Sequence, residues 1–118
     1  MANGNILIEN NKGSTSAGGS ENAFFAIIDQ NGNTITPGTI INQTAPSVYW
    51  DNPITRFVNM GQLSNGNIVF EYQRTDNATT EFRIWSTTTN SWLTDEAPVG
   101  AVSEASLAIG NDGTFMIA

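Results

Sequence analysis

Asn65-Gly66-Asn67-Ile68-Val69-Phe70-Glu71 is the stretch that decides the fold, because it joins a tight turn to a strand and occurs more than once in the chain. After the Asn-Gly pair, Ile68 and Phe70 alternate with Val69 and Glu71, which is the period of two expected of a pleated strand. The Asn-Gly pair itself tolerates the positive φ angles that a two-residue hairpin loop requires. The stretch therefore predicts a β-hairpin.

A second copy of this phrase begins the chain as Asn3-Gly4-Asn5-Ile6-Leu7-Ile8-Glu9, and a looser one ends it as Asp112-Gly113-Thr114-Phe115-Met116-Ile117. The copies start at residues 3, 65 and 112, so they are 62 and then 47 residues apart, in the range of one four-stranded propeller blade. The first copy reads as the second half of a hairpin, and Asn31-Gly32 supplies a further turn signal. Glu9 and Glu71 occupy equivalent positions, which indicates a structural role rather than a catalytic pair.

The rest of the chain also alternates with a period of two, and no segment has a convincing helical period. We predict a single all-β domain, residues 1–118, of short antiparallel strands in hairpins, arranged as about two propeller-like blades or as a small β-sandwich. Residues 11–22 are rich in Gly and Ser and predict a flexible loop. The predicted strands are Asn5–Glu9, Ala23–Asp29, Thr39–Asn42, Arg56–Leu63, Asn67–Tyr72, Thr80–Ser86, Ser106–Ile109 and Thr114–Ile117.

The segment AFFAIIDQNGNTITPGTIIN at residues 23–42 is followed, after a spacer, by FVNMGQLSNGNIVFEYQ at residues 57–73. This pattern resembles the repeat of β-propeller regions in large bacterial surface and secreted proteins. In that repeat an aromatic-rich strand ending in Asp-x-Asn-Gly-Asn leads to a strand ending in Asn, and then to a Leu-x-Asn-Gly hairpin. Such regions hold several blades, whereas fewer than two complete blades fit here, so either other copies complete a ring or the fold is a sandwich.

The composition removes most catalytic chemistry. The 118 residues include no Cys and no His, which excludes thiol nucleophiles, imidazole bases and the commonest zinc ligands. We therefore expect a protein that is not an enzyme and needs no cofactor. The net charge of −7 disfavours binding to nucleic acid. The longest apolar run, residues 23–28, is far shorter than the ~20 residues of a membrane-spanning helix, so we expect no membrane insertion.

Acidic side chains offer two candidates for chemistry. Asp29, Asn31 and Asn33 place oxygen atoms at alternate positions, as at the start of a calcium loop, but the closing Glu of an EF-hand is missing. An Asx-stabilised type I′ turn is the favoured interpretation. Asp95 and Glu96 are adjacent acids of the kind used in glycoside hydrolysis, yet adjacent residues in a strand point to opposite faces. We predict no metal site and no catalytic pair.

Aromatic residues beside polar ones are the candidates for binding a ligand or partner. Tyr49, Trp50 and Asp51 lie between two prolines, and Trp85 and Trp92 flank a run of Ser, Thr and Asn. A ring face covers the C–H groups of a sugar while neighbouring polar groups bind its hydroxyls. The alternative is that Trp85 packs between sheets and Trp50 closes a loop onto the core.

The apolar positions of the strands define a predicted core and a predicted contact between subunits. Because apolar edge strands recruit partners, we expect Asn5–Glu9 and Thr114–Ile117 to pair with each other or with a neighbouring subunit. The side chains assigned to this self-association are Ile6, Ile8, Phe115 and Ile117. The residues expected to be mainly buried are Ile6, Ile8, Phe25, Ile27, Ile40, Phe57, Val58, Leu63, Ile68, Phe70, Phe82, Ile84, Leu107, Ile109, Phe115 and Ile117.

Two functions from different classes follow. In the first, the chain is a non-catalytic structural or binding subunit of an extracellular or virion-surface assembly, whose partners are copies of itself or a neighbouring assembly protein. The low charged fraction of 13% favours a location outside the cell, on a cell surface or on a virion. In the second, it is a lectin-like oligomeric propeller module that binds glycans. The first is favoured because no aromatic-plus-acid motif recurs in each repeat.

Overall fold

The computed structural model describes residues 1–12, 22–41, 55–74, 79–100 and 105–118. These residues form antiparallel β-strands and no helix, so the predicted all-β class is confirmed, and they contain no helix that could span a membrane. The strands are β1 (Ile6–Lys12), β2 (Asn22–Ile28), β3 (Thr34–Ile40), β4 (Thr55–Gln62), β5 (Ile68–Arg74), β6 (Thr80–Ser86), β7 (Ser91–Trp92), β8 (Ala97–Gly100), β9 (Leu107–Ile109) and β10 (Phe115–Ile117).

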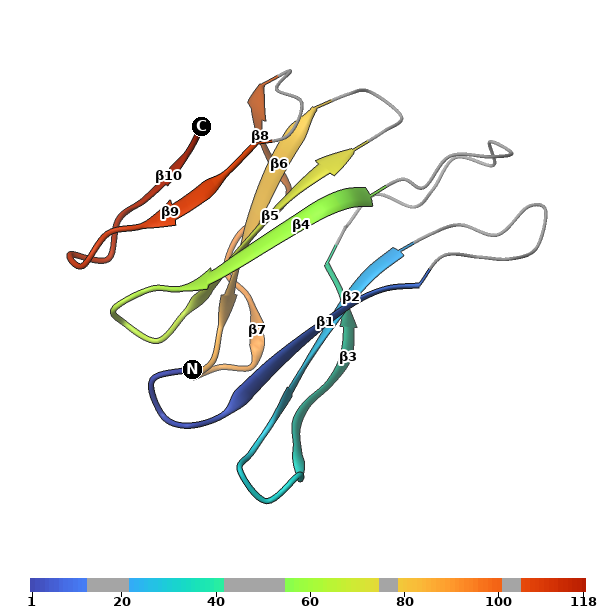
Figure 1. Cartoon of the computed structure of the whole chain (residues 1–118), viewed down its shortest axis with the longest axis vertical. Helices are drawn as coiled ribbons and strands as arrows, with labels where there is room; N and C mark the ends of the chain where they lie inside the picture. The colour runs from blue at the N-terminus through green and yellow to red at the C-terminus, as the bar shows by residue number, and fades with distance from the viewer. Residues whose placement is uncertain (13–21, 42–54, 75–78, 101–104) are drawn as a thin grey trace.

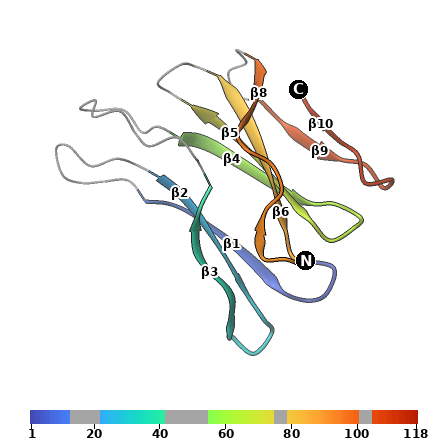
Figure 2. The same cartoon turned by 180° about the vertical axis from the view of Figure 1, so that it is seen from behind.

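Three sheets are stacked in the order in which the chain forms them (Figure 1). The first sheet is the meander β1-β2-β3. The second is five-stranded, with β4-β5-β6-β7 in order and β8 also paired with β6, and the third is the hairpin β9-β10. Figures 1 and 2 show the first sheet on one side of the second and the β9-β10 hairpin on the other.

The main core lies between the first and second sheets, and aromatic rings form its centre. The Phe25 ring centroid lies 4.6 Å from that of Phe70 and 5.1 Å from that of Trp85. Trp92 packs edge-on against these rings at 5.1 to 5.6 Å, in the arrangement that aromatic quadrupoles favour. The buried residues of this cluster are Ala23, Phe25, Ile27, Ile41, Ile68, Phe70, Tyr72 and Trp85.

The second and third sheets meet in a smaller apolar contact. The Phe82 ring of β6 lies 5.3 Å from the Phe115 ring of β10, in a T-shaped arrangement. Gly61 in β4 allows β9 to approach closely, because a Cβ there would lie 2.5 Å from Ile109 Cγ1. The hairpin therefore packs on the face of the second sheet that points away from the first.

Four turns share one hydrogen-bond pattern, and each contains an Asn-Gly or Asp-Gly pair. In Leu63–Asn67, the amide of Gly66 donates to the Leu63 carbonyl (2.9 Å) and the amide of Leu63 donates to the Asn67 carbonyl (2.8 Å). The same two bonds close Asp29–Asn33 and Gly110–Thr114. In Met1–Asn5 the N-terminal ammonium replaces the first amide and donates to the Asn5 carbonyl (3.0 Å).

These turns are three-residue loops, so the predicted two-residue type I′ geometry is wrong. A type I′ turn needs a positive φ at both central residues, whereas the glycine alone has one here, between 81° and 87°. The loop is a type I turn followed by a left-handed glycine. Side chains favour it, since Asn65 Oδ1 accepts the amide of Asn67 (3.0 Å) and holds Asn65 in the turn.

All four turns lie at the same end of the stacked sheets (Figures 1 and 2). The amide of Ala2 donates to Gln62 Oε1 (2.7 Å), which joins the N-terminal turn to the β4-β5 hairpin. A Cβ at Gly113 would lie 2.7 Å from Ser64 Oγ, so the β9-β10 turn adjoins the same hairpin from the other side. The repeat in the sequence is thus a repeat in space.

Most predicted strands agree with the structure to within a few residues, and β6 agrees at both ends. β3 begins at Thr34 and not at Thr39, because Pro37 and Gly38 interrupt its apolar alternation without ending its pairing with β2. The prediction misses β7, which has only two residues, and β8, whose four residues include Pro98 and Gly100, types that are unfavourable in strands. The predicted loop 11–22 is shorter, since its first two residues belong to β1 and its last to β2.

The predicted core is correct for part of its members. Ile6, Ile8 and Ile40 are wrong, because their side chains point away from the second sheet and are 50%, 45% and 43% exposed. Ile41 is buried instead of Ile40, and its amide bonds the Ala23 carbonyl (2.8 Å). The correctly predicted buried residues are Phe25, Ile27, Leu63, Ile68 and Phe70. Half-buried are Val58, Phe82, Ile84, Leu107, Ile109, Phe115 and Ile117, and the side chain of Phe57 lies outside the described residues.

Candidate functional site

The repeated phrase places equivalent residues on equivalent faces of the three sheets. Successive residues of a strand point to opposite faces, so each sheet has two faces that can be named from β1. We call the face that bears Ile6 and Ile8 the front face, and the face that bears Leu7 the back face. The equivalent front-face residues are Ile68 and Phe70 in β5 and Phe115 and Ile117 in β10. The residues equivalent to Leu7 are Val69 and Met116.

Within the chain, the back face of one sheet packs on the front face of the next. Phe25, on the back face of the first sheet, contacts Phe70 on the front face of the second. Phe82, on the back face of the second sheet, contacts Phe115 on the front face of the third. The three sheets therefore stack head to tail, and among the residues that the structure describes the stack has one uncovered front face and one uncovered back face.

The uncovered front face of the first sheet is apolar. Ile6 and Ile8 are about half exposed, although outer antiparallel sheets normally carry polar side chains outward. Contiguous exposed apolar side chains of this kind mark interaction sites. In the described part of the chain β1 pairs with β2 alone, so its other edge carries no strand. The apolar residues of this face are Ile6, Ile8, Phe24, Ala26, Ile28 and Ile40, and polar positions lie toward its ends.

The uncovered back face of the third sheet is smaller. Met116 is 62% exposed and pairs with Ala108, which is also exposed. Phe115 and Ile117 point the other way, onto the second sheet, and are half-buried. Of the side chains predicted to mediate self-association, those of β1 are thus on the surface and those of β10 are largely used within the chain.

The predicted pairing of Asn5–Glu9 with Thr114–Ile117 does not occur within the chain. β1 belongs to the first sheet and β10 to the third, and the five-stranded sheet lies between them (Figure 1). The reason is the stacking order, which puts the two strands in layers that never share an edge. Pairing of either strand with a neighbouring subunit stays a prediction.

Glu9 and Glu71 lie at the same repeat position on the back faces of the first and second sheets. Glu71 is fully buried, and its Oε2 accepts from Asn59 Nδ2 (2.6 Å). The Oε1 atoms of Glu71 and Glu9 have no hydrogen-bond partner among the described residues. Burial raises the pKa of both carboxyl groups, because the charged form loses its hydration. The two side chains occupy different interfaces between sheets.

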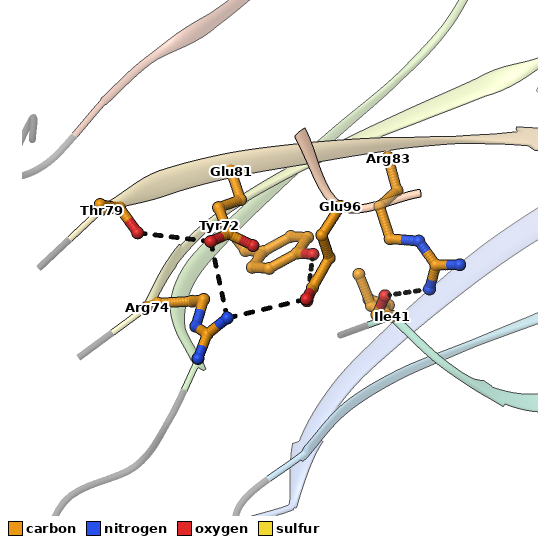
Figure 3. A network of polar contacts seen from close by, with 7 residues as sticks. All are labelled: Ile41, Tyr72, Arg74, Thr79, Glu81, Arg83 and Glu96. Carbon is orange, nitrogen blue, oxygen red and sulfur yellow. Dashed lines mark hydrogen bonds and ion pairs between the residues drawn. The ribbon is translucent and has the colours of Figure 1, made fainter. Parts of the chain in front are cut away.

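Trp85 and Trp92 pack against the core between the first and second sheets. Trp85 is 5% exposed, so its ring faces are covered by protein. The guanidinium carbon of Arg83 lies 3.8 Å from the centroid of the half-buried Trp92 ring, a cation–π contact. Arg83 Nη1 also donates to the Ile41 carbonyl (2.7 Å) and so ties β6 to the first sheet (Figure 3). The other predicted binding residues lie outside the described residues: Tyr49, Trp50 and Asp51.

A polar network (Figure 3) lies toward the end of β5 at Arg74, and the Leu63–Asn67 turn precedes the other end of this strand. Tyr72 Oη donates to Glu96 Oε1 (2.7 Å), and Arg74 Nη1 lies 3.6 Å from Glu81 Oε1 and 3.7 Å from Glu96 Oε2. Burial and the bond to Glu96 raise the pKa of Tyr72, which therefore stays a neutral donor. Asp95 is exposed while Glu96 points into the network. The two adjacent acids therefore lie in different surroundings, although they belong to the connection between β7 and β8 and not to a strand.

The carboxylate of Asp29 is used inside its own turn. Its Oδ1 accepts the amides of Asn31 and Asn33 (2.8 Å each), and its Oδ2 accepts from Asn33 Nδ2 (2.8 Å). These bonds, chiefly that from the Asn33 side chain, lower the pKa of Asp29. The arrangement is that of an Asx turn. Within the described ranges no three Asp, Glu, His or Cys side chains come together in a group able to hold a metal ion.

Comparisons of the chain with family models, with curated proteins and with solved structures found no match. The stacked sheets and their two uncovered faces are therefore the features from which a function is inferred.

Proposed function

We propose that this protein is a non-catalytic structural or binding subunit that self-associates through its terminal β-strands. The observation that carries this proposal is the exposed apolar front face of the first sheet, beside the free edge of β1. Covering apolar surface gains about 25 cal/mol per Å² removed from water. A free strand edge adds unpaired backbone donors and acceptors that a further strand can satisfy. Both gains are available to a protein partner with a matching sheet.

The proposed assembly is extracellular or on a virion surface, and its subunits are copies of this chain or of a neighbouring assembly protein. Composition supports this location, since only 13% of the residues are charged and Asn, Thr, Ser and Gly take their place on the turns. The net charge of −7 supports protein partners over nucleic acid. A propeller-like arrangement of the stacked sheets, with blades contributed by several copies, is part of the same proposal.

Sedimentation velocity over a range of protein concentrations tests the proposal. We expect the parent protein to associate as its concentration rises, and the Ile8→Lys variant to stay monomeric because a charge in the contact must be desolvated. Leu93→Lys is the matched control, since Leu93 is also exposed (54%) but follows β7. It should associate like the parent. A parent protein that stays monomeric at every concentration contradicts the proposal.

A glycan array run on the same preparations separates the alternative class. Carbohydrate binding that persists in both the Ile8→Lys and the Leu93→Lys variants would point to a lectin-like module instead. The burial of Trp85 removes one of the predicted sugar-stacking rings from the surface, so we expect no glycan binding that depends on this residue.

A further inference from the structure

We infer that copies of this chain stack head to tail, with the back face of the third sheet of one copy on the front face of the first sheet of the next. This inference rests on the proposed self-association and adds which two faces meet. Its partner is therefore a second copy of the same chain, presented in one orientation.

The first step is that the exposed front face has two covered equivalents in the same molecule. Ile6 and Ile8 correspond by sequence repeat to Ile68 and Phe70, which are fully buried. What covers Ile68 and Phe70 is the back face of the preceding sheet, including Phe25. The third sheet repeats the rule, because its front face lies under the back face of the second. In both interfaces within the chain, the front face of one sheet thus packs against the back face of the preceding sheet.

The second step is that this chain carries one uncovered back face in its described part, on the third sheet. Met116 is its largest exposed side chain, beside Ala108. Methionine is unbranched and flexible, so it fills the irregular gaps of a partner surface. Lys12 stands at a front-face position at the end of β1, opposite Asn22, whereas the described positions of the back face of the third sheet carry no charge. The apolar residues of the two faces can therefore meet around Ile6, Ile8 and Met116 without burying an unpaired charge, even though each chain carries a net charge of −7.

The third step is symmetry. A contact between two different faces is heterologous, so repeating it builds a closed ring or an open filament, whereas a two-fold dimer would place front face on front face. The turns support the same direction of growth. All four turns lie at one end of the stack (Figure 1), and head-to-tail addition would continue this row from copy to copy.

Crosslinking between single cysteines tests the inference, since the chain has no cysteine of its own. The variants Ile8→Cys (front face) and Met116→Cys (back face) are mixed and treated with a short bis-maleimide crosslinker. We expect front-to-back products to exceed front-to-front and back-to-back products by about tenfold, which corresponds to about 1.4 kcal/mol. Leu93 is exposed but adjoins β6 in the second sheet and belongs to neither of the two faces, so Leu93→Cys measures the level of random collisions. Circular dichroism confirms that each variant is folded, and Ile6→Cys replaces Ile8→Cys if that variant is not.

Other outcomes overturn the inference in distinguishable ways. Dominant Ile8→Cys homodimers would show a two-fold contact, which refutes head-to-tail stacking but keeps self-association. Crosslinked products no more abundant than those of Leu93→Cys, together with a monomer in sedimentation velocity, would refute both the head-to-tail stacking and the proposed self-association.

Discussion

Truncating Phe70 and Ile8 to alanine compares a covered front face with an uncovered one at the same repeat position. Phe70 is fully buried and its ring contacts Phe25 and Trp92. Removing it leaves a cavity in the main core, and phenylalanine-to-alanine changes of this kind cost about 3–5 kcal/mol of unfolding free energy. Ile8 is 45% exposed. Losing its half-buried side chain should cost about 1 kcal/mol, a fraction of the value for a fully buried one.

Thermal unfolding followed by circular dichroism measures the difference. An unfolding entropy of about 2.1 cal/mol/K per residue gives about 0.25 kcal/mol/K for 118 residues. The expected fall in Tm is therefore about 12–20 °C for Phe70→Ala and about 4 °C for Ile8→Ala. The protein is kept dilute, so that association does not cover Ile8. Equal shifts for the two variants would mean that the two front faces are equally buried, and the assigned stacking order would be wrong.

Three further outcomes are expected. Gly32→Ala should lower the free energy of unfolding, measured by urea titration, by about 1–2 kcal/mol, because φ at Gly32 is +85° although a Cβ there meets no other atom. Gly38→Ala, equally unhindered but without a positive φ, should change this free energy little. The pKa of Glu71 is raised above 4.5 by burial, so its native state binds a proton more tightly than its unfolded state. The stability it contributes is present below the unfolded pKa and is lost as pH rises through the folded one. Parent protein should thus gain stability relative to Glu71→Gln as pH falls from neutral toward 4.5, and a difference independent of pH would contradict this. A chelator should leave Tm unchanged, while a large fall in Tm on chelation would favour the alternative of a calcium site at Asp29, Asn31 and Asn33.

Local features of the chain made the strands and turns predictable. Period-two alternation from Thr80 to Ser86 gave β6 its correct ends, because side-chain alternation is a property of a single strand. The Asn-Gly and Asp-Gly pairs gave the position of each turn, since glycine alone adopts the left-handed φ without strain. The detail of the turn was not predictable from the pair, because it depends on which neighbouring amide the Asn or Asp side chain accepts.

The sequence by itself determined the all-β class, the repeat and the alternation of each strand that carries the repeated phrase. Only the tertiary structure decided which of those faces is covered. Ile8 and Phe70 stand at the same position of the same phrase, yet one is half exposed and the other fully buried. The alternation that places each on its face is local, but burial is a property of the layer that packs against that face. The stacking order supplies such a layer for Phe70 and, among the described residues of one chain, none for Ile8.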